Sequence, residues 1–518
     1  MQTDRESWGA TLKLFWHRRV ITMLFLGFSA GIPLLLIFSS LSLWLREAGV
    51  DRAVVTFFSW AALGYSFKFV WAPLVDQLPL PGLSRLLGRR RAWMLVAQCA
   101  IVASILLMAS IDPGQGDSSL TLMAIAAVML GFSSATQDIV IDAFRIESAD
   151  VKLQALLSST YIVGYRIAML LTGAGSLYLA DAFGSTGEAY SYQAWQYTYM
   201  LMAAAMIVGV VITLMVDEPE RSKSKSYLET THEYGRFLFL FALAVTGFIG
   251  AYVFSSEVAT QLKVFLSTLM RNEILSALLV EALRLSAAVI IAWALAIILV
   301  RLNIVRYAML ERTYLMPIRD FFERYGWSFA WMLLALIGLY RISDIVLGVI
   351  SNVFYYDMGF SKTEIATVVK TFGLLMTIVG GLVGGLLAVR IGVIRMLLVG
   401  GVLAAATNLL FMLLASIGYD MFWFYLVISA DNLSAGIASA AFVAFLSSLT
   451  NVSFTAMQYA IFSSLMTLIP KSLGGYSGSM VNAIGYQNFF LVTAILGIPV
   501  LLLIIFAARR FEIHQRSN

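Results

Sequence analysis

Four basic side chains interrupt stretches of sequence that are otherwise apolar enough to lie in lipid: Lys68, Arg166, Arg341 and Lys370. A charge at the centre of a bilayer is costly, so ions at that depth mark the path of a solute unless they neutralise each other. The four positions are distributed over both halves of the chain. They therefore predict a membrane protein that binds and moves something anionic.

One apolar stretch, near residues 120–144, carries two carboxylates four residues apart, Asp138 and Asp142, followed by Arg145. Asp142 and Arg145 are within reach of each other on a helix, and we expect them to form a structural pair. Asp138 lies about 6 Å deeper along the helix axis and has no basic neighbour on its own helix. Desolvation penalises the charged form of a carboxyl group, which could then bind and release a proton as water access changes. We predict Asp138 as the proton-coupling residue, and the alternative is a neutral acid hydrogen-bonded between helices.

Neighbouring polar and aromatic side chains could bind polar groups of a solute, and the family resemblance described below implies that these are sugar hydroxyls or acetamides. Gln137 is expected to face a cavity beside Asp138, where its amide offers both donors and an acceptor. Tyr161 and Tyr165 fall on one helix face, and Arg166 follows directly. Aromatic rings can pack against a sugar while the phenol supplies a hydrogen bond, although most tyrosines in membrane helices do neither.

The second half of the chain supplies further candidates. Tyr340, Arg341 and Asp344 fall within about one helical turn. Arg341 and Asp344 could bind a solute or, equally well, neutralise each other. Asp431 and Asn432 would complete this wall, either as partners for the basic residues or as ligands for the amine of a peptide.

Lys68 and Lys370 each fall in the predicted second helix of a half, and neither has an acid one turn away on its own helix. An internal repeat would place them at corresponding positions. A lysine pair that faces one cavity could bind several carboxylates of a solute from both sides.

The composition sets the environment of these residues. Hydrophobic residues make up 60% of the 518 residues and charged residues 13%, with a mean hydropathy of +0.85, which is typical of a polytopic membrane protein. The single cysteine, Cys99, excludes a disulfide within the chain, and the three histidines fall in terminal or linker segments. An enzyme with a nucleophile–base set or a metal cluster is therefore not expected. No nucleotide-binding loop is visible, and the predicted driving force is a proton gradient without a cofactor.

Apolar runs of about 20 residues predict six helices, then two, then six. The predicted spans are residues 20–45, 53–71, 92–111, 120–144, 156–180, 195–216, 237–254, 274–300, 327–356, 362–389, 395–417, 421–449, 454–480 and 488–508. The expected fold class is an all-α polytopic membrane protein with 14 transmembrane helices. Its expected domains are a six-helix bundle over 1–218, basic linkers with an inserted helix pair over 219–326, and a second six-helix bundle over 327–518.

Basic residues predict the orientation. Most of the 35 lysines and arginines fall in loops on the side of the N-terminus, and such residues collect on the cytoplasmic side of a membrane. We therefore expect both termini to be cytoplasmic. We also expect the first helix to be retained, because no small-residue cleavage site follows it.

Two loops repeat between the halves. Residues 73–76 and 88–91, Pro-Leu-Val-Asp and Gly-Arg-Arg-Arg, have counterparts in residues 384–390 and in Gly392 and Arg395. Two six-helix halves with such loops resemble the major facilitator superfamily, whose halves enclose a site near the midplane. The resemblance implies that loop and helix-end charges latch the inward side; the alternative is that they only anchor the topology. These candidate gating or structural residues are Asp76, Arg89, Arg90, Arg91, Asp142, Arg145, Arg390 and Arg395.

An ordered set of short motifs in both halves is similar to the AmpG family of muropeptide permeases. These motifs occupy residues 26–33, 67–73, 88–93, 134–143, 164–166, 317–322, 369–373, 431–432 and 440–444. The resemblance implies a bacterial inner-membrane importer of N-acetylglucosaminyl-1,6-anhydro-N-acetylmuramyl peptides, driven by the proton gradient. It would serve peptidoglycan recycling and would bear on β-lactamase induction.

Three features leave this interpretation open. The inserted helices 237–300 separate the halves, whereas some relatives carry extra helices after the twelfth, so this pair could instead bind a partner. At Asp431 relatives can have Glu, and at Arg341 Lys also occurs, which affects reach and hydrogen-bonding geometry. The alternative function is transport of another bulky organic anion, such as an acyl-CoA or a drug-like solute. We expect a monomer without nucleic-acid partners.

Overall fold

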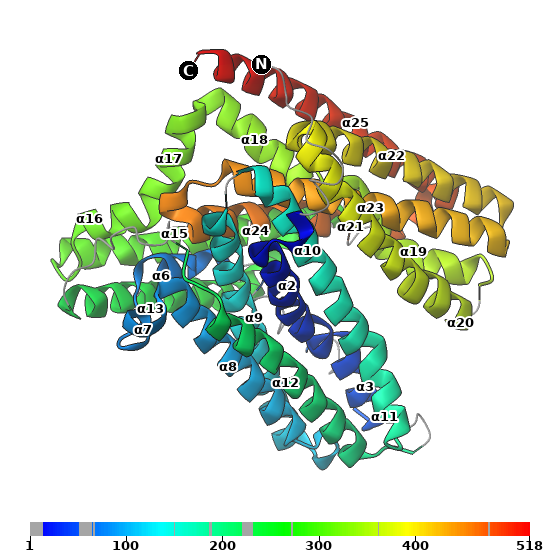
Figure 1. Cartoon of the computed structure of the whole chain (residues 1–518), viewed down its shortest axis with the longest axis horizontal. Coiled ribbons are helices and arrows are strands. Elements are labelled where there is room, and N and C mark those ends of the chain that lie inside the picture. Colours follow the sequence, from blue (N-terminus) through cyan, green and yellow to red (C-terminus); the bar gives the residue numbers. More distant parts are fainter. Residues whose placement is uncertain are drawn as a thin grey trace. The chain divides into compact units, whose positions relative to one another are not determined.

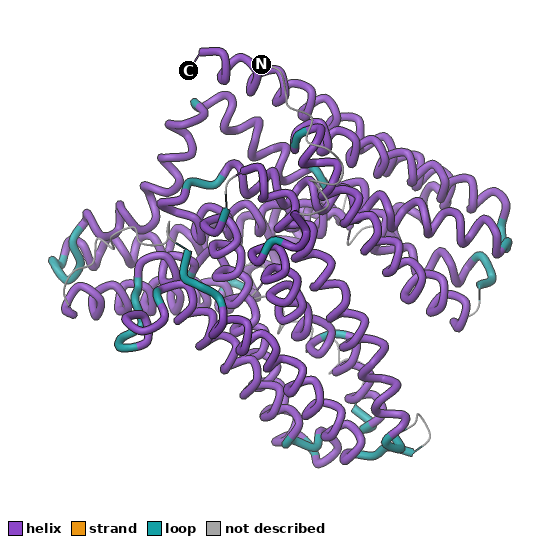
Figure 2. Tube along the Cα trace, viewed as in Figure 1, coloured by secondary structure: helices purple, strands orange, loops and turns teal. Residues whose placement is uncertain are grey.

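The structure of the protein is a computed structural model, which describes residues 14–50, 58, 65, 68–149, 151–185, 189–219, 231–270, 273–360, 362–474 and 477–517. These residues form helices and connecting segments, and no strand occurs among them (Figure 2). The predicted all-α class is confirmed. Its physical basis is that a helix satisfies its own backbone hydrogen bonds, which lipid cannot do.

The chain divides into two compact units. The first comprises Met1–Val75, Pro79–Ser224 and Trp331–Asn518, and the second comprises Asp76–Leu78 and Lys225–Ala330. The first unit therefore contains most of both predicted six-helix halves, and the second contains the inserted helices.

In the N-terminal half, the first crossing is made by two helices that meet at Phe38, and the fifth contains a π-helical segment, Leu171–Gly175. The predicted second span lies mostly outside the described residues, which resume at a 3-10 turn, Lys68–Val70. The α-helices are α2 Arg18–Ile37, α3 Ser39–Glu47, α6 Ala72–Gln77, α7 Leu83–Leu87, α8 Arg89–Ala109, α9 Asp117–Ser148, α10 Val151–Leu170, α11 Ser176–Ala182 and α12 Tyr192–Met215 (Figure 1).

In the C-terminal half, the first crossing is broken at Tyr340 and Arg341, and the second contains a π-helical segment, Ala366–Phe372. The last helix has a kink at Gly485, where φ is 75°. The α-helices are α18 Trp327–Leu339, α19 Ile342–Asp357, α20 Lys362–Ile365, α21 Gly373–Ile391, α22 Val393–Ile417, α23 Met421–Leu449, α24 Thr455–Gly474 and α25 Ser477–Ser517.

The inserted segment contains more helix than predicted. Besides α13 Thr231–Phe254 and α15 Glu273–Arg301, it has α14 Ser256–Met270, which packs against α15. Arg284 of α15 places its guanidinium 3.8 Å from the centre of the Tyr252 ring and donates to the Tyr252 carbonyl, closing the end of α13. The segment continues with α16 Tyr307–Leu310, a π-helical segment Glu311–Leu315 and α17 Met316–Tyr325.

Twelve helical segments among the described residues are long and apolar enough to cross a membrane. They correspond to all the predicted spans except 53–71, which lies mostly outside those residues, and 274–300. The second of these is present as α15, within which Ser286–Arg301 forms a shorter apolar segment.

Glycines set the closest helix approaches in each half. A Cβ on Gly164 of α10 would lie 1.9 Å from the carbonyl oxygen of Leu24 on α2. A Cβ on Gly380 of α21 would lie 2.1 Å from the carbonyl oxygen of Leu433 on α23. Small residues at such contacts allow backbones to approach in a membrane, and here the obstacle is backbone that cannot rotate away.

We predict that Gly164→Ala destabilises the protein by about 1–3 kcal/mol, the usual cost of overpacking. Thermal unfolding in detergent would measure this. Gly348→Ala is the matched control, because a Cβ on Gly348 of α19 would have no neighbouring atom within 4 Å. That change should leave stability equal or raised by up to about 1 kcal/mol. Equal stability of the two variants would contradict the predicted role of close packing.

Candidate functional site

The two bundles of the first unit meet at the ends of their helices that carry Arg89–Arg91 and Arg390–Arg395, which we call the basic end. There α10 packs against α21 and α23, and α9 packs against α24. The hydroxyl of Ser159 donates to the Gly381 carbonyl at 2.7 Å. Figure 1 shows α11 and α20, which lie at the opposite helix ends, well apart. The basic end is therefore where this structure is closed.

A buried ion pair supports this junction. Arg90 at the start of α8 binds Glu147 near the end of α9, with an Nη2–Oε1 distance of 2.6 Å, and both side chains are at most 1% exposed. The same Nη2 donates to the Thr455 hydroxyl of the other bundle at 2.8 Å, and Nη1 donates to the Val75 carbonyl at 3.1 Å. Thr455 also donates to Glu147. Removing one partner of such a pair leaves an uncompensated buried charge, so these contacts depend on each other.

A second charged group crosses the junction nearby. Asp142 accepts from Arg145 at 3.1 Å and lies 3.7 Å from the Lys68 ammonium. Arg145 also donates to Ser447 of the other bundle at 2.6 Å, and its guanidinium lies 5.1 Å from the centre of the Tyr459 ring. The predicted pairing of Asp142 with Arg145 is confirmed. Lys68, by contrast, has a carboxylate partner on another helix, which the sequence did not reveal.

Asp138 lies one helical turn from Asp142, and its carboxylate has a hydrogen-bond acceptor that no described residue fills. Its side chain is buried, and Oδ1 has no hydrogen-bond partner among the described residues. The charges that act on it are those of Lys68, which attracts it, and Asp142, which repels it. The phenols in its electrostatic surroundings are Tyr65, Tyr161, Tyr165 and Tyr459. The unfilled acceptor and the nearby lysine are suited to a carboxyl that exchanges a proton.

Gln137 lies elsewhere than expected. It is fully buried, and its Nε2 donates to the Ser29 hydroxyl of α2 at 3.0 Å. The expectation that it faces a cavity beside Asp138 is wrong for this structure. Consecutive residues of an α-helix point about 100° apart, so Gln137 is directed into the N-terminal bundle.

Arg166 has little to neutralise it. Tyr161 and Tyr165 lie on one face of α10 as predicted, with ring centres 6.1 Å apart. The described hydrogen bond of Arg166 is to the Met169 sulfur at 3.6 Å, and no described carboxylate forms an ion pair with it. Its guanidinium is repelled by Arg341 and attracted by Asp344, both in the other bundle, and the repulsion is larger than the attraction. Arg166 of one bundle and Arg341 of the other thus repel each other, and no described ion pair neutralises Arg166.

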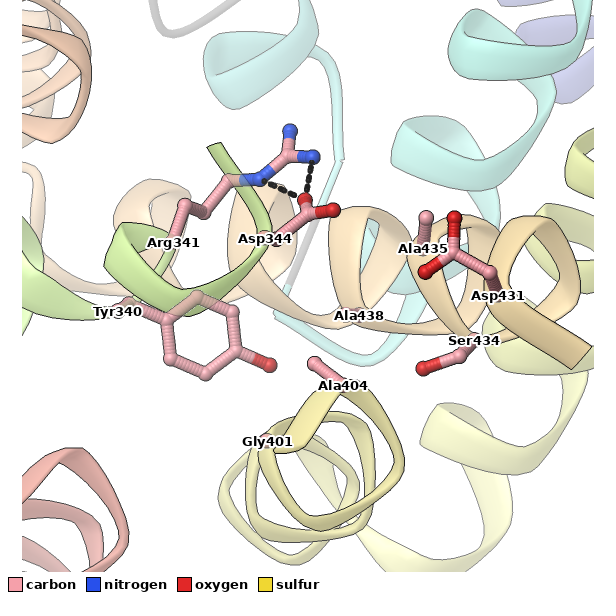
Figure 3. A pocket seen from close by; sticks show the side chains of 9 residues that line it. All are labelled: Tyr340, Arg341, Asp344, Gly401, Ala404, Asp431, Ser434, Ala435 and Ala438. Atoms are coloured by element: carbon pink, nitrogen blue, oxygen red, sulfur yellow. Dashed lines mark hydrogen bonds and ion pairs between the residues drawn. The ribbon is translucent and has the colours of Figure 1, made fainter. Parts of the chain in front are cut away.

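A pocket within the C-terminal bundle is lined by Tyr340, Arg341, Asp344 and Asp431 together with small residues (Figure 3). Arg341 donates to Asp344 through both Nε and Nη2, so the pairing that the sequence left open is present. Tyr340 is fixed by stacking on Phe442, with ring centres 4.3 Å apart, and by donating to the backbone of α22. Arg341 lies in the break between α18 and α19 and lines the pocket.

Asn432 joins helices. Its amide donates to the Ile428 carbonyl at 3.0 Å and accepts from Thr377 of α21 at 2.9 Å. The bond with Thr377 holds α23 against α21. Asn432 therefore has a structural role, although it directly follows the pocket residue Asp431.

Lys68 and Lys370 occupy different environments. Lys370 is exposed in the π-helical segment of the second crossing, whereas Lys68 is buried and paired. The two lysines are therefore not equivalent in burial or in partners, and their joint binding of a solute stays a prediction.

The remaining basic-end residues divide by what they contact. Arg91 donates to the Thr213 and Leu214 carbonyls and so fixes the end of α12. The backbone N–H groups of Arg90 and Arg91 donate to Glu218, whose charge also suits the positive start of α8. Asp76 is buried at the end of α6, Arg390 is half-buried and Arg395 is exposed. Among the predicted gating residues, Arg90 and Arg145 donate hydrogen bonds to the other bundle.

Several residues of this site were not singled out in the sequence: Tyr65, Glu147, Ser434, Ser447, Thr455 and Tyr459. For Glu147 a signal existed, because an acid two residues after Arg145 at the end of an apolar stretch invites a search for a buried base. The hydroxyl and phenol residues carry no such signal, since serine, threonine and tyrosine are common in membrane helices.

Comparisons with known proteins agree with this architecture. A family model described as Major Facilitator Superfamily matches residues 23–351. A solved structure of the proton:xylose symporter XylE has a TM-score of 0.59 at 11% identity and covers 95% of each chain. A structure of the transporter FucP in the outward conformation has a TM-score of 0.58 at 12% identity, covering 95% of this chain and 99% of that one. At these identities the likeness concerns the fold alone.

Sequence relatives extend over almost the whole chain. A protein of Rickettsia felis named "Putative transporter AmpG 4" is 30% identical over 97% of this chain and 99% of its own length. The "Anhydromuropeptide permease" of Escherichia coli K12 is 29% identical over 98% of this chain and 83% of its own length. The chain belongs to the Major Facilitator Superfamily, and its class is that of a transporter rather than an enzyme. Within that superfamily it groups with the AmpG-like permeases.

We predict that Glu147→Gln opens the basic end, because loss of one partner from a buried ion pair costs about 3–5 kcal/mol. A reporter cysteine at Ala155, which is 2% exposed on α10 beside α21, would be introduced after replacing the exposed Cys99 by serine. Its labelling rate by a thiol reagent should rise at least about tenfold.

Glu323→Gln provides the control for this experiment. Glu323 is 62% exposed and pairs with Arg319 on α17, and exposed pairs contribute at most about 1 kcal/mol. It should leave the labelling rate unchanged. An equal rate in the Glu147 variant and the parent would show that the ion pair does not hold the junction closed.

Proposed function

We propose that the protein is a proton-coupled importer of anhydromuropeptides in the bacterial inner membrane, serving peptidoglycan recycling. The name of the Escherichia coli relative supports this solute class. The observation in the structure that carries the proposal is Arg166, whose charge has no described carboxylate partner and is repelled by Arg341. An anionic group bound between the two bundles would remove that repulsion. A muropeptide offers several such carboxylates.

The aromatic residues beside Arg166 suit the sugar part of the same solute. Tyr161 and Tyr165 present neighbouring rings on α10, with a tilt of 44° between them. Such rings combine an apolar surface with a hydroxyl that exchanges hydrogen bonds. A solute with sugar rings and carboxylates would contact both kinds of group on one helix.

The direction of transport follows from the charges in the loops. If basic loops are cytoplasmic, both termini are cytoplasmic and the closed basic end faces the cytoplasm. The structure then corresponds to an outward-facing form, ready to receive a solute from the periplasm. The Arg90–Glu147–Thr455 and Arg145–Ser447 contacts would form the inner gate.

Proton binding would change the charge beside that gate. With every acid ionised, Lys68 and Arg145 balance Asp138 and Asp142, and the group is neutral. A proton on Asp138 removes its attraction for Lys68 and gives the group one net positive charge. This charge would attract an anionic solute and at the same time increase repulsion between the cations at the gate. Proton binding would thereby favour both solute binding and inner opening.

We predict that Asp138→Asn abolishes the stimulation of uptake by an imposed pH gradient while solute binding survives. Asparagine keeps the shape of the side chain but cannot exchange a proton. Uptake of radiolabelled anhydromuropeptide into membrane vesicles, with and without the gradient, would measure this. Asp181→Asn, at an exposed position of α11, is the matched control and should behave as the parent protein.

Two outcomes would contradict the proposal. Equal gradient dependence in the Asp138 variant and the parent would remove Asp138 from the coupling role. Absence of uptake by correctly inserted parent protein would remove muropeptides as the solute. Competition by an acyl-CoA or a drug-like anion would then test the alternative of another bulky organic anion.

We further predict that Arg166→Gln weakens binding of anhydromuropeptide at least about tenfold, because hydrogen bonds to charged groups contribute about 1.5–3 kcal/mol. Equilibrium binding to the purified protein would measure the change. Arg509→Gln, at an exposed position near the end of α25, is the control and should not alter affinity. If both variants bind as the parent does, Arg166 does not contact the anion.

A further inference from the structure

The pocket of the C-terminal bundle holds acceptor oxygens that the proposed anion site does not use. Nε and Nη2 of Arg341 both donate to the same oxygen of Asp344, Oδ2, and no described hydrogen bond involves Oδ1 of Asp344. Asp431 accepts from Thr407 at 3.4 Å through Oδ1, and no described hydrogen bond involves its Oδ2. The pocket therefore has two carboxylate oxygens available to a donor.

A buried hydroxyl points to a bound group. Ser434 is 3% exposed, lines the pocket, and its Oγ has no hydrogen-bond partner among the described residues. In Figure 3 the side chains of Asp431 and Ser434 lie on the same helix and border the pocket. A buried polar atom without a partner is costly, and a ligand that supplied a donor would remove that cost.

The charge of the pocket selects the sign of the ligand. Arg341 contributes one positive charge, and Asp344 and Asp431 contribute two negative charges when ionised. The residues that line the pocket then carry one negative charge in excess, in a region where charges are expensive, and Arg166, which interacts with Arg341 and Asp344, is not among them. A monovalent cation would neutralise this excess.

The geometry favours an ammonium group over a metal ion. A primary ammonium has three N–H donors, and the pocket offers oxygens of Asp344, Asp431 and Ser434. Magnesium and calcium ions require six or more oxygen ligands, and the guanidinium of Arg341 occupies one side of this cluster. Gly401, Ala404 and Ala435, whose side chains are small, form the adjacent wall.

We propose that this pocket binds a primary ammonium group of the transported solute, while Arg166 and Arg341 bind a carboxylate of the same solute. The pair of sites would recognise an end group that carries both charges, such as the free end of a diamino dicarboxylic acid in a stem peptide. This inference rests on the proposed function, because it takes the solute to be a peptide conjugate. In this arrangement the amine of the solute and its carboxylate bind on opposite sides of Arg341.

The test compares two anhydromuropeptides that differ in one amino group. One has a tripeptide stem ending in a diamino dicarboxylic acid, and the other lacks only the distal amine of that residue. Binding of both to the full-length protein in detergent would be measured for the parent, Asp431→Asn, Ser434→Ala and Asp181→Asn. The last variant removes an exposed acid outside the pocket.

The expected result is a preference of the parent for the amine-bearing compound of at least about tenfold. The preference should fall to within about twofold in Asp431→Asn, decrease in Ser434→Ala and persist in Asp181→Asn. Ser434→Ala tests the pocket independently if the Asp431 variant does not fold. An undiminished preference in the folded pocket variants would overturn the inference.

The result for the parent separates this inference from the proposed function. If the parent binds both compounds with equal affinity, muropeptide binding stands and the ammonium site is refuted. If the parent binds neither compound, the proposed solute class is refuted and the inference falls with it.

Discussion

The closed arrangement of the two bundles depends on buried ion pairs of one bundle that form further hydrogen bonds with the other. Arg90 and Glu147 neutralise each other within one bundle, but Thr455 of the other bundle bonds to both. Arg145 likewise binds Asp142 on its own helix and Ser447 across the junction. Separation of the bundles would leave polar groups without these partners, unless water enters to replace them. Closure of this end therefore requires that water is excluded from the junction, and such coupling is what a gate requires.

The site above this junction divides its charges unevenly. Around Asp138, lysine, arginine and carboxylates lie close enough to compensate one another, so the balance can be altered by a single proton. Around Arg166 the compensation is incomplete, because Arg341 is already engaged by Asp344. The N-terminal bundle thus offers an adjustable charge near the closed end, and the C-terminal bundle offers a fixed ion pair beside a pocket. In the proposed transport of a charged solute, the charges around Asp138 would respond to a proton and the ion pair would position the solute.

The sequence predicts the features that depend on neighbours along the chain. Long apolar runs must be helical in lipid, and Asp142 and Arg145 are three residues apart, so both the helices and this pair could be expected. Contacts between distant segments, such as Lys68 with Asp142, depend on how helices pack and have no local signal. The adjacency of Gln137 to Asp138 in the sequence does not bring the two side chains together, because consecutive residues of a helix point about 100° apart. Helix α14 was missed because it is short and less apolar than its neighbours.

The break between α18 and α19 has a mechanical consequence. The hydroxyl of Tyr340 donates to the backbone of α22, and its ring stacks on Phe442 of α23. Arg341 directly precedes α19, and Asp344 lies in the first turn of α19. The first crossing is therefore divided beside the pocket, with a joint of two residues, Tyr340 and Arg341, between α18 and α19. A small rotation of α19 about that joint would carry the ion pair relative to Asp431 and leave Tyr340 in place. The affinity of this pocket for a ligand would then depend on the tilt of α19 alone.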